Sequence, residues 1–344
     1  MTNAGPADHF GSYFASRTMR NLGTFHAERA AILYNPVARG LRRRNALGMA
    51  VRALAAQGID ARLIPTAGPG SASEQAREQI EAGCDLIIAA GGDGTINEVA
   101  NGMLHSPVPL AVLPGGTANV LAREISLSLQ IERVAAQITE LVPVRVAVGI
   151  LRLGTSQRVF LCMAGAGLDA EIVYRLNLDL KAALGKLAYY VGGFRQVFRP
   201  LREFDVWVDG KRFEASFALV SRVRNYGGDL EIARGASLLR NDFEVVLFRG
   251  THSMRYLRHL AAVLLGRLYD APGCTVLRGR SVKCAPSLSS RPEGPQNRIY
   301  VQVDGELAGE LPITAEVLPE AVTLLVPQYY LAREQRFAAA AAIV

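Results

Sequence analysis

The residues with the clearest chemical potential form a glycine-rich segment, Gly91–Asn97, which reads Gly-Gly-Asp-Gly-Thr-Ile-Asn. It follows the apolar run Asp85–Ala90, which predicts a buried strand, and it precedes residues with helical spacing. Glycines between a strand and a helix let the backbone approach a phosphate and direct amide groups toward it. The carboxylate of Asp93 is well placed to hold Mg²⁺, directly or through water; the alternative is that Asp93 only caps its own turn. The segment predicts a site for nucleotide phosphates.

A second glycine turn follows in the segment Leu113–Arg123, which reads Leu-Pro-Gly-Gly-Thr-Ala-Asn-Val-Leu-Ala-Arg. One such turn is weak evidence because glycine turns occur in many α/β proteins, but two in this wording form a specific pattern. The chain has neither a GxxxxGK[ST] loop nor a protein-kinase signature, so it offers no P-loop lysine. The phosphate charge must therefore be met by backbone amides, helix N-termini and Mg²⁺.

Alternating strand and helix patterns position these turns. The expected strands are Ala31–Tyr34, Ala61–Pro65, Leu86–Ala90 and Leu110–Leu113, and the first expected helices are Arg42–Ala56 and Ser71–Ile80. Ser71 and Glu74 have the spacing of a capping box at the second helix. Repeated β-α units predict a doubly wound parallel sheet with right-handed crossovers.

In such a sheet, ligands bind beyond the carboxyl ends of the strands. Asn35, Thr66 and Gly91 directly follow expected strands, and Gly115 lies two residues after the end of another. We therefore expect these four turns to converge on one crevice.

From Val142 onward the pattern becomes β-rich. The expected strands are Arg145–Leu153, Arg158–Met163, Phe204–Val208, Phe213–Val220, Glu244–Phe248, Tyr300–Val303 and Val322–Val326. Asp209-Gly210 and Asp304-Gly305 lie between alternating runs and predict hairpins. We expect an antiparallel second domain interrupted by helices over residues 182–198 and 253–268.

The expected domain boundaries follow from these patterns. Residues 1–28 are a mobile extension, 29–141 the α/β nucleotide-binding domain, 142–327 the β-rich domain and 328–344 a tail that is mobile after Phe337. A chain of 344 residues is long for a single core, which agrees with two domains.

The net charge of +7 and the isoelectric point near 9.4 favour acidic partners such as nucleotides or anionic lipid surfaces. The basic clusters are short and lack interleaved aromatic residues, so we expect no nucleic-acid partner. No apolar run is long enough to span a membrane, and the amino terminus lacks the apolar core of a signal peptide, which favours a cytoplasmic protein. The four cysteines are scattered and are expected to be reduced and structural.

With its two glycine motifs and a late Asp-Gly-Glu element, the chain resembles the diacylglycerol kinase catalytic family, specifically the soluble bacterial lipid kinases that are similar to sphingosine kinases. The resemblance runs from Ala31 to Pro327. It implies an α/β nucleotide domain and a β-sandwich domain with the active site between them, ATP as substrate, and Mg²⁺. The residues it implies for nucleotide binding are Asn35, Thr66, Gly91, Gly92, Asp93, Gly94, Thr95, Ile96, Asn97, Gly116 and Thr117.

The resemblance also implies roles in the second domain. Glu306 would be the base that accepts the proton of the lipid hydroxyl, with Asp304 as its orienter or as a metal contact, whereas Asp209-Gly210 is the same dipeptide without such a role. The metal-binding aspartate of the family falls on Arg240 here, and Asp242 replaces it only if the turn is shifted by two residues. A second departure is Gly40, which comes one position late behind Arg39, so that Arg39 is itself a candidate to face the phosphates.

The expected function is ATP-dependent phosphorylation of a lipid hydroxyl, with diacylglycerol converted to phosphatidic acid. The alternatives are a kinase of a sphingoid base, ceramide or other long-chain alcohol, an NAD kinase, and a catalytically silent nucleotide-binding regulator at a membrane surface. The helices expected over 182–198 and 253–268 have apolar faces with basic rims, which suit peripheral association with a membrane. These faces are equally compatible with a packed core, and a homodimer stays open.

Overall fold

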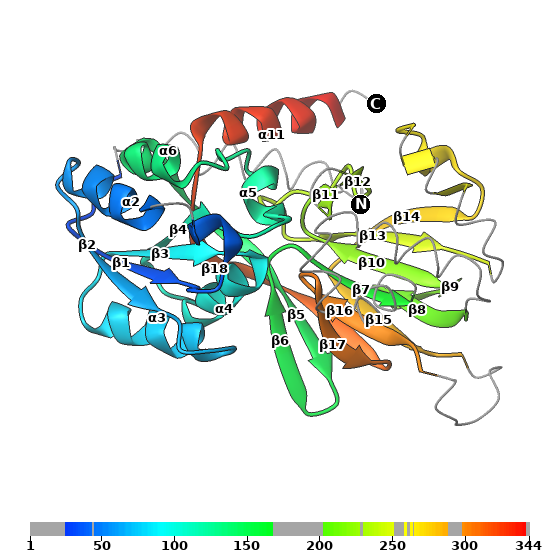
Figure 1. The fold of residues 1–344 in the computed structure, drawn as a ribbon. Helices are drawn as coiled ribbons and strands as arrows, with labels where there is room; N and C mark the ends of the chain where they lie inside the picture. The colour runs from blue at the N-terminus through cyan, green and yellow to red at the C-terminus, as the bar shows by residue number, and fades with distance from the viewer. Residues whose placement is uncertain are drawn as a thin grey trace, which may run out of the picture. The chain divides into compact units, whose positions relative to one another are not determined.

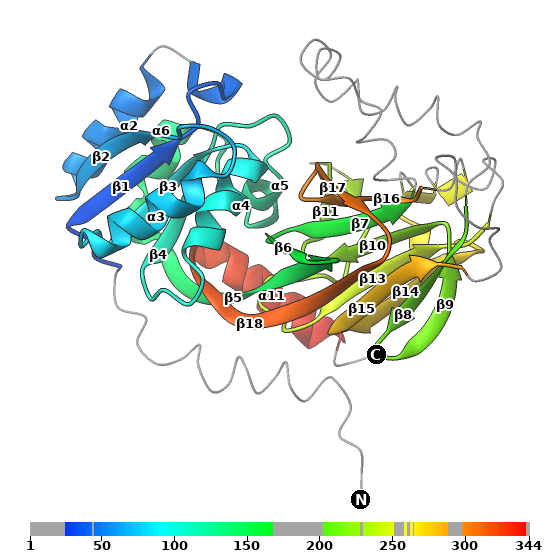
Figure 2. The same cartoon turned by 90° about the horizontal axis from the view of Figure 1, so that it is seen from below.

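The computed structural model describes residues 25–42, 45–167, 202–227, 230–250, 258–259, 262–263, 265–287 and 298–341. Its contacts divide the chain into two units (Figures 1 and 2). The first unit comprises Met1–Gly116, Ala122–Val146 and Glu320–Val344, and the second comprises Thr117–Leu121 and Ala147–Pro319. The sequence places the boundary at 141/142, close to the end of the first unit's middle segment. The helix expected over 182–198 and most of that over 253–268 lie outside the described residues.

The first unit is built on a parallel sheet with the strand order β2-β1-β3-β4. The bounds are β1 Arg29–Tyr34, β2 Asp60–Pro65, β3 Leu86–Gly91 and β4 Pro109–Pro114. All residues of β3 are buried, as expected for a parallel strand that is covered on both faces. The expected doubly wound sheet is confirmed.

Helices cover both faces of this sheet (Figure 1). α2 (Ala46–Ala55) and α6 (Ile131–Ala136) pack on one face, and α3 (Ser71–Glu81) and α4 (Asp93–Gly102) pack on the other. The shorter elements are η1 Arg39–Arg42, η2 Ile138–Glu140 and α5 Val120–Glu124.

The N-terminus of α3 is stabilised differently from the sequence-based expectation. Its N-cap residue is Gly70, which has no side chain, and the Ser71 hydroxyl instead accepts hydrogen bonds from the preceding loop. The N–H of Ala72 donates to the Glu98 carboxylate of α4 at 3.3 Å. The predicted capping box of Ser71 and Glu74 is therefore wrong, because a neighbouring helix supplies the acceptor.

The C-terminal elements return to the first unit. β18 (Ile313–Val326), the long strand in Figure 2, pairs in parallel with β4 through Thr323 and Leu324. It is followed by α11 (Gln328–Ala341), whose Tyr330 and Glu334 are buried. Two expectations are thus corrected: Val322–Val326 belongs to the first unit, and the chain after Phe337 is helical as far as Ala341. The apolar end of β18 is fully buried and pairs with β4 in the parallel sheet, which brings the chain back to the first unit.

The second unit is antiparallel and β-rich. One sheet has the order β14-β13-β10-β7-β16-β17. Outside this sheet, β15 pairs with the first half of β18 on one side and with β8 on the other. β8 also pairs with β9, and β5 pairs with β6. The bounds are β5 Val142–Leu153, β6 Ser156–Phe160, β7 Met163–Gly167, β8 Phe204–Val208, β9 Lys211–Ala215, β10 Phe217–Ser221, β11 Asn225–Tyr226, β12 Leu230–Glu231, β13 Phe243–Phe248, η3 Leu268–Asp270, β14 Cys274–Gly279, β15 Ser281–Pro286, β16 Tyr300–Val303 and β17 Glu306–Glu310.

A shared hydrophobic core joins the two sheets of this unit. Its largest members are aromatic, including Phe160 and Phe243, whose rings stack with their centroids 5.5 Å apart. Val206 of β8 and Val301 of β16 place side chains from both sheets in the same cluster. The predicted β-sandwich is confirmed, as are the hairpins at Asp209-Gly210 and Asp304-Gly305.

The thiols of Cys274 and Cys284 are shielded from water. Burial raises the pKa of the Cys284 thiol to about 12 and that of the Cys274 thiol to about 11. These thiols are therefore protonated at neutral pH and are poor metal ligands there. No helix in the part of the chain that the structure describes is long and apolar enough to cross a membrane.

Candidate nucleotide and phosphotransfer site

The turns after the parallel strands meet at the carboxyl edge of the first unit's sheet. Backbone hydrogen bonds join neighbouring turns: the Asn35 N–H donates to Ala90 O (3.0 Å), the Thr66 N–H to Tyr34 O (2.9 Å) and the Gly115 N–H to Gly91 O (2.7 Å). The strand register explains this, because Tyr34 lies level with Pro65 and Ala90, and Gly91 with Pro114. The structure thus brings together the four turns that the sequence predicted to converge.

Close backbone packing explains why these turns are glycine-rich. The Gly40 N–H donates to Gly115 O at 3.0 Å. A Cβ on Gly40 would lie 2.8 Å from that oxygen, and a Cβ on Gly115 would lie 3.3 Å from Gly91 Cα. The late glycine behind Arg39 therefore packs against the second glycine turn, while Arg39 itself begins η1 and is exposed.

The N-terminus of α4 opens at this edge. Gly92 is its N-cap residue, in an extended conformation with φ −85° and ψ 178°, and Asp93 is the acidic residue of the first turn. The first N–H groups of an α-helix have no acceptor within the helix, and the partial positive charge of the helix end favours anions. Residues 92–95 are only half-buried, so phosphate oxygens can reach these amides.

Side chains fix the first turn of α4 against the turn after β1. Asn35 Nδ2 donates to Thr95 Oγ1 at 3.4 Å, and Asn35 Oδ1 accepts from the Val37 N–H at 3.0 Å. Ile96 is fully buried and its N–H donates to Gly92 O, so Ile96 anchors the turn in the core. Asn97 follows on the same helix and is half-buried.

The second glycine turn lies beside the first. A Cβ on Gly92 would lie 3.4 Å from Gly116 Cα, which places Gly116 next to the start of α4. Thr117 follows directly and is exposed, and its contacts group it with the second unit.

The second unit holds the Asp-Gly-Glu element in the hairpin between β16 and β17. Asp304 and Gly305 have φ angles of 46° and 85°, which are left-handed values. The Asp304 carboxylate accepts three backbone N–H groups, from Leu161 (3.0 Å), Cys162 (3.0 Å) and Met163 (2.8 Å). Asp304 thereby ties the hairpin to the chain before β7, and its carboxylate is largely committed to these amides.

Glu306 has a different environment. It is the first residue of β17, pairs with Val303, and is exposed. Among the described residues its carboxylate has neither a hydrogen-bond nor an ion-pair partner. Gln302, which is 1% exposed, accepts from the Gly305 N–H at 2.8 Å and so holds the turn that presents Glu306. Sequence reasoning missed Gln302, although it lies two residues before the Asp-Gly pair.

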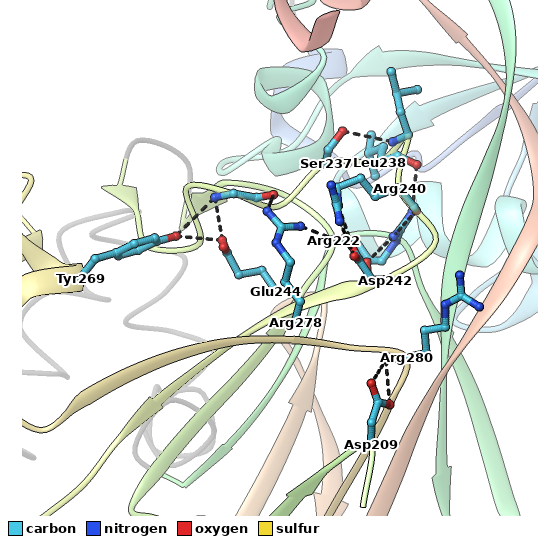
Figure 3. A network of polar contacts seen from close by, with 12 residues as sticks. Asp209, Arg222, Ser237, Leu238, Arg240, Asp242, Glu244, Tyr269, Arg278 and Arg280 are labelled. Carbon is cyan, nitrogen blue, oxygen red and sulfur yellow. Dashed lines mark hydrogen bonds and ion pairs between the residues drawn. The ribbon is translucent and has the colours of Figure 1, made fainter. Parts of the chain in front are cut away.

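Asp242 lies in the turn before β13 (Figure 3). Its carboxylate is held by Arg240, with Nε–Oδ1 at 2.8 Å and Nη2–Oδ2 at 2.5 Å, and Arg278 Nη1 lies 3.5 Å from Oδ1. In the described residues, no three histidine, cysteine or acidic side chains are grouped so that they could hold a metal ion.

Comparison with known proteins agrees with both units. Residues 29–151 match the family model described as "Diacylglycerol kinase catalytic domain". Residues 29–151 thus belong to the diacylglycerol kinase catalytic-domain family. Residues 162–326 of this lipid kinase match the model described as "YegS C-terminal NAD kinase beta sandwich-like domain", so the two models together cover most of the chain.

Curated relatives carry the same family name. A diacylglycerol kinase of Bacillus subtilis (strain 168) is 29% identical over 83% of this lipid kinase and 92% of its own length. A diacylglycerol kinase of Staphylococcus epidermidis is 26% identical over 88% of this chain and 93% of its own length. A crystal structure of a diacylglycerol kinase from Bacillus anthracis str. Sterne has a TM-score of 0.70 at 23% identity and covers 89% of this chain and 99% of its own; this likeness shows the fold alone.

Proposed function

We propose that this family member is an ATP-dependent lipid kinase that phosphorylates diacylglycerol to phosphatidic acid. The main support is the set of hydrogen-bonded glycine turns at the N-terminus of α4, together with a carboxylate, Glu306, that has no partner among the described residues. The names of the curated relatives support diacylglycerol as the acceptor. The match of residues 29–151 to the diacylglycerol kinase catalytic domain supports a kinase activity.

The first unit would hold the nucleotide phosphates mainly through its backbone. The amides of residues 93–95 at the start of α4 would donate to phosphate oxygens, and the glycines would let the phosphates approach. Asn35 would keep Thr95 oriented through the hydrogen bond between Nδ2 and Oγ1. Thr66, Gly116 and Thr117 are proposed to line the nucleotide, since they flank or continue the same turns.

Asp93 is the residue that fits a metal ion best in the first unit, because it is an acidic side chain in the first turn of α4, beside the expected phosphates. Mg²⁺, when bound there, would offset negative charge on the β- and γ-phosphates.

Glu306 would act as the general base. Its carboxylate would accept the proton of the lipid hydroxyl as the lipid oxygen bonds to the γ-phosphorus, while the bond from that phosphorus to the bridging oxygen breaks and ADP leaves. Asp304 would not touch the reacting atoms. It would position Glu306 by fixing the turn through three N–H groups.

The substrate lies in a membrane, so we propose that the enzyme is a cytoplasmic protein that associates with membrane surfaces peripherally. The net charge of +7 supports attraction to anionic lipids. The helices that the sequence suggests for this contact lie largely outside the described residues.

The proposal is tested by incubating the purified protein with γ-labelled ATP, Mg²⁺ and single lipids in mixed micelles. The acceptors are diacylglycerol, ceramide, sphingosine, monoacylglycerol and undecaprenol, with NAD as a soluble acceptor. We expect label in phosphatidic acid. Label in another lipid instead would keep the mechanism and replace the substrate, whereas label only in NAD, or in no acceptor, would overturn the proposal.

A further inference from the structure

Arg222 is a fully buried cation directly after β10, in the second unit, with 0% of its surface exposed. Its guanidinium is surrounded by backbone carbonyl oxygens (Figure 3). Nη1 donates to Arg240 O (2.6 Å) and Asp242 O (2.7 Å), and Nη2 donates to Leu238 O (2.8 Å) and Ala147 O (3.2 Å). Three of these oxygens belong to the turn before β13, so the guanidinium holds that turn together.

Carbonyl oxygens converging from one turn are ligands that Ca²⁺ or Mg²⁺ also uses, usually with at least one carboxylate. The resemblance places a metal-binding aspartate in this turn, at the position of Arg240. The guanidinium of Arg222 already lies among the oxygens, so a metal ion that bound them would have to displace it. Two cations that close together in a buried region would repel each other strongly.

The carboxylates near the turn are also engaged with other groups. Asp242 is paired with Arg240 and Arg278. Glu244, which is 3% exposed, accepts from the Gly235 N–H (2.7 Å) and the Tyr269 hydroxyl (2.8 Å). Burial and the neighbouring Glu244 carboxylate raise the pKa of the Tyr269 phenol far above its usual value, so it stays a donor.

We propose that the guanidinium of Arg222 is a built-in cation that replaces a divalent metal in the turn over residues 237–242. The turn is therefore independent of divalent ions. Arg is suited to this role because it stays charged when buried and presents several N–H donors in a fixed plane, which match several carbonyl oxygens at once. The inference concerns the second unit alone and holds whichever acceptor is phosphorylated.

The direct test is hydrogen–deuterium exchange of the wild-type protein without nucleotide, comparing Mg²⁺ with EDTA. The readout is the exchange of peptides that cover residues 235–248, which report on the turn itself. We expect the same protection in both conditions. Faster exchange of these peptides in EDTA would overturn the proposal, because it would show that a divalent ion holds the turn.

Substitution of the arginine gives the second test. Arg222→Ala leaves the carbonyl oxygens without these donors, and we expect the melting temperature to fall by on the order of 10 °C. Arg249→Ala is the matched control, since Arg249 is an exposed arginine of the same unit that pairs with Glu214; we expect a shift of no more than about 1 °C. Equal shifts in the two variants would contradict a structural role for the guanidinium.

A rescue experiment completes the test. Arg222→Ala combined with Arg240→Asp removes the guanidinium, supplies a carboxylate and releases Asp242 from its ion pair with Arg240. We expect Ca²⁺ or Mg²⁺ to raise the melting temperature of this double variant by several degrees, by binding to the folded state alone, but not to change that of the wild type. If Arg222→Ala fails to fold, the exchange experiment on the wild type still decides the proposal.

Discussion

Two Asp-Gly turns in the second unit have nearly the same backbone but different surroundings. Asp209-Gly210 joins β8 to β9 with φ angles of 46° and 84°, and Asp304-Gly305 joins β16 to β17 with φ angles of 46° and 85°. Both aspartates accept backbone N–H groups from a neighbouring segment. Asp209 accepts two, from Arg280 and Ser281, whereas Asp304 accepts three.

The two turns differ in a way that distinguishes residues needed for the hairpin from a residue that could act in catalysis. Asp209 binds backbone N–H groups of a neighbouring segment, as Asp304 does. Stabilisation of the turn alone therefore accounts for an aspartate at either position. The turns differ at the residue after the glycine, which is Lys211 in one and Glu306 in the other, each at the start of its second strand. This difference supports our proposal that Glu306 is the general base and that Asp304 positions it.

The largest effect is expected at Glu306. Glu306→Gln keeps the shape of the side chain but removes the base, so kcat should fall by roughly 100- to 10,000-fold. The affinity for ATP and the melting temperature should stay unchanged because Glu306 has no partner in the described fold. Lys211→Gln, the same position in the other turn, should leave kcat unchanged. Similar losses of kcat in both variants would show that the two turns do not differ in function.

The next effect is expected at the two aspartates. Asp304→Asn weakens charge-assisted bonds to three N–H groups and should cost about 1–3 kcal/mol of unfolding free energy. Asp209→Asn should cost less, because Asp209 is exposed and accepts two N–H groups. Denaturant unfolding measures both values.

Activity measurements distinguish the two aspartates further. Asp304→Asn should also lower kcat, with KM for ATP unchanged, because the turn that carries Glu306 is loosened. Asp209→Asn should not change kcat. An unchanged kcat in Asp304→Asn would show that Asp304 does not position the base.

The smallest effect is expected at the turn glycines. Gly210 and Gly305 both have left-handed φ angles, and a Cβ on either would meet no atom within 4 Å. Gly210→Ala and Gly305→Ala should therefore each cost about 1 kcal/mol, from backbone strain alone. Thermal unfolding of the two variants checks this, and a much larger loss in one would mean that the turns are not equivalent.

Much of this architecture could be predicted from local pattern. The apolar runs before Gly91 and Gly115 predicted buried parallel strands, whose carboxyl ends must share one edge of the sheet. The Asp-Gly pairs predicted both hairpins because a two-residue turn with left-handed φ angles favours these residues. The convergence of Asn35, Thr66, Gly91 and Gly115 followed from topology.

The features that sequence reasoning missed depend on contacts between distant segments. The acceptor for the N-terminus of α3 comes from Glu98, 26 residues away from Ala72. The oxygens around Arg222 include one 16 residues away and one 75 residues away, so no local spacing marks it as the cation of a turn. The parallel pairing of β18 with β4 joins Thr323 to Pro109, which are 214 residues apart along the chain.

The most direct test of the account is transfer of label from γ-labelled ATP to diacylglycerol by the wild type, Glu306→Gln and Lys211→Gln side by side. ATP affinity is measured in the same preparations. We expect labelled phosphatidic acid with the wild type and Lys211→Gln, and almost none with Glu306→Gln although it binds ATP normally. Equal label from all three proteins, or no label from the wild type, would contradict the role of Glu306 as the base of a diacylglycerol kinase.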